Sequence, residues 1–411
     1  MTAQALDFRS RFALPVGSDG RPLIYLTGNS LGLMPLSAPA RVGQILDQWA
    51  RLAVEGHFSG VDPWYTYHDQ FREPMARVVG ARAGEVVVMN TLTVNLHLML
   101  ATFWQPVPGR TRIVIEADAF PSDTYAVESH VQARGFDPAE VVVRLGPPGG
   151  ESLLRTEDLE GFLADEGGSV ALVMLPGVQY FTGQWLDIER MTTAAHRAGA
   201  RAGFDLAHAA GNVPLALHDW NVDFAVWCTY KYLNAGPGAI AAAFVHERHG
   251  NDPGLPRLAG WWGNDPATRF RMHLNRHFVP RPGAEGWAAS NPPILAMAPL
   301  LASLEIFDEA GMPALRRKSL TLTGALEAGL RAAAGDRATI LTPSDPEARG
   351  CQLSVRVPEH SRAVFDHLRA CGVVADYRQP DVIRLAPVPL YNTIEEMHQV
   401  ATYFAAALES P

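Results

Sequence analysis

The sequence predicts an α/β fold with a mostly parallel central sheet, followed by a smaller α+β domain. Short apolar, often β-branched runs alternate with longer helical patterns along the first 250 residues or so. Several of these runs are continuously apolar, which is typical of strands covered on both faces. The expected strands are EVVVMN (85–90), RIVIE (112–116), EVVVRL (140–145), SVALVML (169–175), RAGFD (201–205), DFAVWCT (223–229) and AIAAAFV (239–245).

Helical periodicity and composition complete the expected domain plan. Helices fit roughly residues 37–53, 94–104, 187–199 and 295–310. Beyond about residue 295, long Ala/Leu-rich helices surround two strand-like runs, RGCQLSVRV and DVIRLAPV, which indicates an α+β unit. We therefore expect an N-terminal segment (1–55) that packs with the small domain, a large domain (56–290) and a small domain (291–411). The Pro- and Gly-rich stretch at 277–287 marks the boundary region.

Bulk composition excludes several classes of protein. The chain has 411 residues, a formal charge of −9 and a pI near 5.9, so we expect neither a nucleic-acid nor a membrane partner, which would require a basic face. The cysteines, Cys228, Cys351 and Cys371, are few and widely spaced, which predicts reduced thiols and no metal site. The start MTAQALDFRSRF lacks an apolar export signal, so we expect a cytoplasmic protein.

Lys231 is an unusual residue in this composition. The 34 basic residues include only two lysines, Lys231 and Lys318, and all the others are arginines. An arginine keeps its proton in a protein, whereas a lysine among apolar neighbours can act as an amine. Lys231 follows the apolar run DFAVW and lies between two tyrosines. We therefore interpret it as a reactive amine, with a solvated surface lysine as the structural alternative.

A carboxylate at a strand end strengthens this interpretation. Asp205 ends the run RAGFD, and His208 follows three residues later. A strand-end carboxylate together with a lone lysine suits pyridoxal 5'-phosphate, because the lysine forms a Schiff base while the carboxylate keeps the pyridine nitrogen protonated. Thr91 and Thr93 open an apolar helix, which is either a phosphate-binding helix start or a plain N-cap. The stretch AFPSD (119–123), taken alone, is a loop.

Arg384 lies within the apolar strand-like run DVIRLAPV. A buried guanidinium needs an anion, and its fork geometry matches a carboxylate through two parallel hydrogen bonds. An amino-acid substrate would supply that carboxylate. A structural ion pair with Asp376 or Asp381 explains the pattern equally well, so both interpretations stay open.

Eight motifs follow one another along the chain. They are TGNSLG (27–32), MNTLTVNLH (89–97), AFPSD (119–123), the stretch from Asp205 to Gly238, AGWWG (259–263), SNPPI (290–294), RGCQLSV (349–355) and APVPLYN (386–392). Single motifs of this kind are weak, but eight in the same order, one of them 34 residues long, are specific. Through almost its whole length the sequence resembles the kynureninase family.

The resemblance implies a fold type I (aspartate aminotransferase-like) pyridoxal-phosphate enzyme, a homodimer with sites at the subunit interface, which cleaves L-kynurenine or 3-hydroxykynurenine into an anthranilate and L-alanine. It also implies roles for individual residues. Lys231 would bind the cofactor covalently and act in catalysis with Tyr230 and Asp205, and Tyr230 would be either an acid or a phosphate ligand. The other cofactor-binding residues would be Leu92, Thr93, Phe120, Pro121, Ser122, Asp123 and His208, with Trp261 and Asn291 reaching over from the second subunit.

The substrate-binding residues implied by the resemblance are Ser30, His57, Asn291 and Arg384. His57 and Asn291 resemble the polar pair of members that favour 3-hydroxykynurenine. Four positions depart from the family pattern and place the aryl pocket in question: Pro176, Asn264, Ala288 and Ala289. The alternatives are a related lyase such as a cysteine desulfurase, a kynureninase-like enzyme for a substituted kynurenine, and a non-catalytic protein that keeps the fold.

Overall fold

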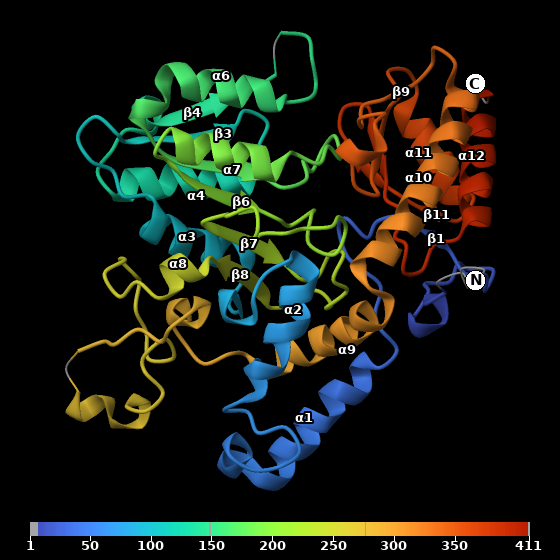
Figure 1. The fold of residues 1–411 in the computed structure, drawn as a ribbon. Coiled ribbons are helices and arrows are strands. Elements are labelled where there is room, and N and C mark those ends of the chain that lie inside the picture. Colours follow the sequence, from blue (N-terminus) through green and yellow to red (C-terminus); the bar gives the residue numbers. More distant parts are fainter. Residues whose placement is uncertain (1–6, 148, 276, 410–411) are drawn as a thin grey trace.

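The computed structural model describes residues 7–147, 149–275 and 277–409. Its centre is a seven-stranded sheet in the order β2-β8-β7-β6-β5-β3-β4 (Figure 1). Neighbours from β7 to β4 run parallel, and β8 is antiparallel to both β7 and β2. All seven expected strands are therefore confirmed: β2 (Val86–Val88), β3 (Arg112–Glu116), β4 (Val142–Leu145), β5 (Val170–Pro176), β6 (Arg201–Asp205), β7 (Phe224–Cys228) and β8 (Ala241–Val245).

Helices cover both faces of this sheet, which explains the continuously apolar strands. Alternate residues enter different cores: Val114 and Val173 belong to one hydrophobic cluster, and Ile113 and Leu172 to another. The expected helices near 94–104 and 187–199 are confirmed. The helices of the large domain are α3 (Leu92–Phe103), α4 (Pro121–Ala133), α5 (Pro138–Val141), α6 (Thr156–Glu166), α7 (Ile188–Arg197) and α8 (Glu247–Gly250).

One local prediction was wrong. The stretch AFPSD is not a loop: Phe120 is the N-cap of α4, and Pro121 occupies the first helical position. Proline fits there because its missing N–H group would have no partner in the first turn.

The small domain is built on a four-stranded antiparallel sheet in the order β12-β13-β10-β9. Its core is a third hydrophobic cluster that includes Leu326, Leu353 and Phe404. The strands are β9 (Thr339–Ile340), β10 (Leu353–Arg356), β12 (Asp376–Arg378) and β13 (Val382–Leu385), and the helices are α10 (Met312–Ala334), α11 (Ser361–Ala370) and α12 (Ile394–Glu409).

The N-terminal segment contacts both parts of the molecule. Strand β1 (Ile24–Tyr25) pairs in parallel with β11 (Val373–Val374) of the small domain. Helix α1 (Ala38–Leu52) and helix α2 (Arg72–Val79) pack against α9 (Ile294–Ala310), as Figure 1 shows. The domain limits at residues 55 and 290 remain a proposal, and residues 1–6 and 410–411 lie outside the described residues. Within those residues, no helix has the length and hydropathy needed to cross a bilayer.

Candidate active site

A pocket lies where the parallel strands end, as the topology requires for ligand sites in open α/β sheets. Asp205 is the last residue of β6, and Lys231 follows the neighbouring strand β7 by three residues. Together with its open mouth the pocket encloses about 730 Å³. It brings together nine of the predicted residues: Leu92, Thr93, Phe120, Ser122, Asp123, Asp205, His208, Tyr230 and Lys231.

The Lys231 amine lies at the centre of this group. Its Nζ is 3.0 Å from Nε2 of His208 and within 6.0 Å of the ring centroids of Phe120 and Tyr230. Burial lowers the pKa of His208 well below its ordinary value, and the nearby charges of Lys231 and Arg384 act in the same direction. The imidazole is therefore neutral, and its Nε2 lies within hydrogen-bond distance of the Lys231 Nζ.

Asp123 and Asp205 form a carboxyl pair. Burial raises the pKa of Asp123 well above its ordinary value, and the charge of Asp205 and a hydrogen bond to it add to this shift. The raised pKa favours the protonated form of Asp123, while Oδ1 of Asp205 accepts the Ala207 N–H at 2.7 Å. Two carboxyl groups at this position suit a protonated ring nitrogen.

Hydroxyl groups gather where two helices begin. Thr93 Oγ1 lies 3.2 Å from Ser122 Oγ, and the two residues belong to the first turns of α3 and α4. Thr91 occupies the N-cap position of α3, as one of the two interpretations expected, but its side chain makes no capping hydrogen bond. Free N–H groups at a helix start bind phosphate readily.

The residues present fit pyridoxal phosphate. Phe120 is 42% exposed at the pocket, so one ring face is free for stacking. Within the described residues, Asp123 Oδ1 and His208 Nδ1 are buried and have no hydrogen-bond partner. Such orphaned groups are costly unless a ligand satisfies them. The Lys231 amine matches the aldehyde of the cofactor, and the carboxyl pair matches its ring nitrogen. The Phe120 ring can stack on the cofactor ring, and the hydroxyl-lined helix starts match the phosphate. Pro121 does not line the pocket itself.

Arg384 lies outside the pocket lining, behind one wall. It is 1% exposed on β13, its Nε donates to Asp376 Oδ2 at 2.6 Å, and its Nη1 donates to the Tyr180 carbonyl at 2.6 Å. The ion pair with Asp376 that the sequence left open is therefore present, whereas Asp381 approaches Arg356 instead. Within the described residues, neither hydrogen bond occupies Nη2, and Tyr180 itself lines the pocket.

Three other predicted residues lie in a second, aromatic pocket. His57, Trp261 and Asn291 line a space of about 800 Å³, together with Trp64 and Phe270. None of these three lines the pocket of Lys231. Ser30 lies exposed between Thr27 and Gly32, and the Gly32 N–H donates to the Tyr230 carbonyl at 2.8 Å. One protomer therefore places the predicted residues in separate groups.

Of the four departures from the family pattern, only Pro176 lines the pocket of Lys231. Asn264 is 4% exposed, accepts the Val279 N–H and donates to Thr268 Oγ1, so its amide supports its own loop. Ala288 is buried in the hydrophobic cluster beneath the outer strands. Neither of these two residues, nor Ala289, lines the aromatic pocket.

Comparison with known proteins agrees with this geometry. A family model described as the kynureninase C-terminal domain matches residues 315–404. The kynureninase of Xanthomonas oryzae pv. oryzae (strain PXO99A) is 54% identical over 405 residues, which cover 97% of this chain and 95% of that protein. The chain belongs to the kynureninase family. The kynureninase of Stenotrophomonas maltophilia (strain K279a) is 53% identical, with 95% and 92% of the two chains covered.

Solved structures confirm the expected fold for this kynureninase family member. The cystine C–S lyase C-DES superposes with a TM-score of 0.76 at 18% identity, covering 93% of this chain and 97% of that one. The cysteine desulfurase CsdA from Escherichia coli gives a TM-score of 0.75 at 17% identity, with 98% of both chains covered. Identities this low show the fold alone. Cys228 and Cys351 are buried in the present structure, which disfavours either as a sulfur carrier, and the partly exposed Cys371 follows α11 in the small domain.

Two polar residues of this pocket, Glu116 and Tyr180, were not predicted from the sequence. Glu116 ends β3 and Tyr180 lies in the loop after β5, and both line the pocket of Lys231. Their positions in the sequence could have indicated both residues, because a residue that ends or follows a parallel strand lies at the ligand-binding edge of the sheet. The strand RIVIE was correctly delimited, but its final glutamate was not considered as a site residue.

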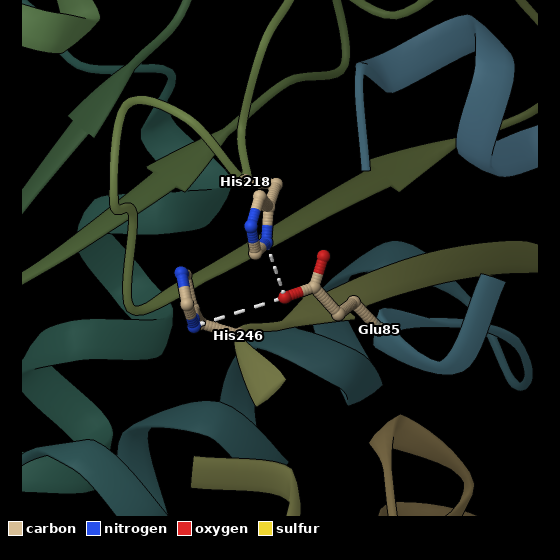
Figure 2. A group of neighbouring side chains, drawn as sticks. All are labelled: Glu85, His218 and His246. Carbon is tan, nitrogen blue, oxygen red and sulfur yellow. Dashed lines mark hydrogen bonds and ion pairs between the residues drawn. The ribbon is translucent and has the colours of Figure 1, made fainter. Parts of the chain in front are cut away.

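A cluster of Glu85, His218 and His246 lies at the edge of the large sheet opposite the pocket of Lys231 (Figure 2). Its spacing allows a metal ion, but its atoms already have protein partners. Glu85 Oε1 accepts from His218 Nδ1 and from the Glu247 N–H, both at 2.9 Å, and His246 Nδ1 accepts the Arg248 N–H. The two imidazole rings stack with 21° between their planes, so their in-plane lone pairs do not converge. We interpret the cluster as a structural hydrogen-bond network.

Proposed function

We propose that the protein is a pyridoxal-phosphate-dependent kynureninase, which hydrolyses the Cβ–Cγ bond of L-kynurenine or 3-hydroxy-L-kynurenine to give an anthranilate and L-alanine. The observation that carries this proposal is the position of Lys231 beside the Asp123–Asp205 carboxyl pair in one pocket, in a chain 54% identical to a kynureninase. Cleavage at Cβ–Cγ needs an electron acceptor attached to the amino-acid nitrogen, and the bound cofactor supplies it.

Different pocket residues bind different parts of the cofactor. Lys231 holds the cofactor through its Nζ, and the Asp123–Asp205 pair balances the ring nitrogen. Phe120 stacks on one ring face, and Thr93 and Ser122 donate hydrogen bonds to the phosphate. Support for these roles comes from the shared pocket lining and the 3.2 Å approach of the two hydroxyls.

Lys231 and its neighbours carry out the proton transfers of the reaction. As a free amine, Lys231 takes the proton from the substrate Cα and returns it, and neutral His208 accepts a hydrogen bond at Nε2 that orients the amine. Burial raises the pKa of Tyr230, so its phenol keeps the proton at neutral pH. A protonated phenol suits both an acid and a phosphate ligand, and both roles remain candidates for Tyr230.

Arg384 binds the substrate carboxylate. Its Nε and Nη1 hold it against Asp376 and the Tyr180 carbonyl, and Nη2 is the nitrogen that offers its hydrogens to the ligand. Burial lowers the pKa of Arg384, yet a guanidinium stays charged at neutral pH. The ion pair therefore serves to fix the guanidinium plane before substrate arrives.

A homodimer completes the site. His57, Trp261 and Asn291 lie together in the aromatic pocket, apart from Lys231, and a second subunit would bring this pocket to the aryl group of the substrate. The imidazole and amide offer hydrogen-bonding groups beside aromatic walls, which favours 3-hydroxykynurenine because its extra hydroxyl needs a partner.

The deciding experiment compares turnover of kynurenine with that of 3-hydroxykynurenine, with fluorescence detection of the anthranilate product. The proposed function requires product from at least one substrate, and no product from the Lys231→Ala variant. Sulfide from L-cysteine without any anthranilate would instead indicate a desulfurase. A protein without visible cofactor absorbance, unchanged by Lys231→Ala, would indicate a non-catalytic protein.

A further inference from the structure

Glu116 is a buried carboxyl that the roles above do not use. It is the last residue of β3 and is 5% exposed. It lines the same pocket as Asp205 and Lys231. Within the described residues, its Oε2 has no hydrogen-bond partner. A buried carboxylate without compensation is costly, so such a group takes up a proton or finds a ligand.

The partner of Glu116 is held in one orientation. Gln179 Oε1 accepts the N–H groups of Phe181 and Thr182 at 2.6 and 2.8 Å, so the amide nitrogen of Gln179 must face the other way. That nitrogen donates to the Asp118 carbonyl at 3.1 Å, and the same amide favours the ionised Glu116 carboxyl. The loop after β5 therefore interacts with the carboxyl group, while its Oε2 has no protein partner within the described residues.

The charges around Glu116 do not favour its ionised form. On its own segment lies Asp118, and across the pocket lie the Asp123–Asp205 pair and Lys231. Burial raises the pKa of Glu116, the Gln179 amide lowers it and the charge of Asp118 raises it, and the net result is a pKa of about 7. The other titratable side chains lining this pocket are His208, Tyr180 and Tyr230.

We propose that Glu116 is a further cofactor-binding residue that takes part in its protonated form. Pyridoxal phosphate brings an anionic phosphate into a pocket that already holds the carboxyl pair, so the complex favours a neutral Glu116. By linkage, cofactor binding and protonation of Glu116 strengthen each other. This inference rests on the proposed function, because it requires that the cofactor occupy this pocket.

The test measures the dissociation constant of pyridoxal phosphate for the apoprotein between about pH 6 and pH 9, through the visible cofactor band and tryptophan fluorescence. In the wild type, the dissociation constant rises with pH on the alkaline side of neutrality, by roughly tenfold per pH unit at most from this one group. Glu116→Gln keeps a neutral hydrogen-bonding group but cannot titrate. It should therefore lose the component of the pH profile that Glu116 causes, which is the rise of the dissociation constant above neutral pH.

Asp118→Asn is the matched control, because it removes the same charge two residues away from an exposed side chain. The dissociation constant of the Asp118→Asn variant should still rise with pH, but the rise should begin at a lower pH. The reason is that the Asp118 charge no longer raises the Glu116 pKa. Glu116→Asp retains a titrating carboxyl and should restore the component. Together with Asp118→Asn, it decides the question even if Glu116→Gln fails to fold.

Identical pH profiles for Glu116→Gln and the wild type would overturn the inference while leaving the proposed function intact. Loss of the component in Asp118→Asn would overturn it as well. If the wild type forms no cofactor band at any pH, the proposed function itself fails, and the inference fails with it.

Discussion

Lys231 gains its chemical character from residues that are close in space and distant in sequence. His208 lies 23 positions earlier but approaches the amine to 3.0 Å, and Phe120 contributes a ring from the start of another helix. The strand ends of β6 and β7 make this possible, because adjacent parallel strands finish at the same edge of the sheet.

Replacement of Lys231 by alanine should remove covalent attachment of the cofactor and lower the rate of kynurenine cleavage by at least about a thousandfold, since both the tether and the proton carrier are lost. The measurement is mass spectrometry of the borohydride-reduced protein, together with turnover. Lys318→Arg changes the other lysine of the chain and should keep both. Full attachment in Lys231→Ala would show that another group holds the cofactor.

Replacement of Arg384 by alanine should raise KM for the amino-acid substrate by roughly ten- to a hundredfold, because a charged hydrogen bond of about 1.5–3 kcal/mol disappears. The cofactor band should persist, since Arg384 does not line the pocket. Steady-state kinetics and the absorbance spectrum measure the two effects. Arg356→Ala on the same sheet is the control, and equal KM values in both variants would contradict the assignment.

Asp223 provides a residue-scale prediction about stability. It accepts hydrogen bonds from His196, His249 and Arg248; burial raises its pKa, but these bonds outweigh burial and lower it overall. Its folded pKa lies below the unfolded value, so its stabilising effect is present above about pH 4 and is lost as the pH falls further.

Asp223→Asn should therefore lower the free energy of unfolding by about 3–5 kcal/mol at pH 7, with a smaller difference at acid pH. Urea denaturation at both pH values measures this. Asp366→Asn, on an exposed helix surface, should leave stability unchanged. An equal loss for Asp223→Asn at both pH values would argue that the ionised carboxylate is not responsible.

At the scale of elements, the turn at Thr27–Gly32 is fitted to the loop that carries Lys231. The Gly32 N–H donates to the Tyr230 carbonyl, and a Cβ at Gly32 would lie 2.3 Å from the Lys231 carbonyl oxygen. No real Cβ tolerates that approach, so only glycine allows the two backbones to meet here.

Gly32→Ala should displace the Lys231 loop and weaken cofactor binding by at least tenfold, because the clash is with backbone and cannot be relieved by a rotamer change. Titration of the apoprotein with pyridoxal phosphate measures the effect. Gly43→Ala meets open space on α1 and should keep the affinity while stabilising the helix by up to about 1 kcal/mol. Unchanged affinity in Gly32→Ala would mean that the loop relaxes without moving the amine.

Elements were predictable where the pattern was local. Each strand of the large sheet was predictable from a short apolar run, and α7 was predictable from a helix-periodic pattern of apolar residues. The start of α4 was not recognised, because its first turn, Pro121–Asp123, is polar and follows an exposed phenylalanine. The Asp123–Asp205 contact joins segments that are far apart in the chain, and a single sequence does not record it. The Arg384–Asp376 pair was one of the interpretations left open by the sequence, and the register of β12 on β13 selects Asp376 over Asp381.

At the scale of the molecule, the predicted site residues of one chain occupy two pockets. The cofactor residues surround Lys231, while His57, Trp261 and Asn291 surround an aromatic space. The resemblance named residues of both groups, and how the groups combine depends on the proposed dimer, which no single-chain pattern describes.

A shared site predicts complementation between inactive variants. Lys231→Ala lacks the amine, and Asn291→Ala with Trp261→Ala lacks the aromatic pocket, so each homodimer should be nearly inactive. Random mixing after dissociation should restore about a quarter of the wild-type sites, since half of the dimers are mixed and each carries one intact site. Activity of the mixture measures this. A mixture no more active than its parts would place each site within one subunit.

Strand β1 pairs with β11, and Figure 1 shows the two strands side by side in the small domain. The small domain is therefore discontinuous in sequence, because one of its strands comes from the first 25 residues. A polypeptide cut near residue 290 would yield a C-terminal fragment with an unpaired edge at Val373–Val374, and only co-expression with the N-terminal fragment would restore it.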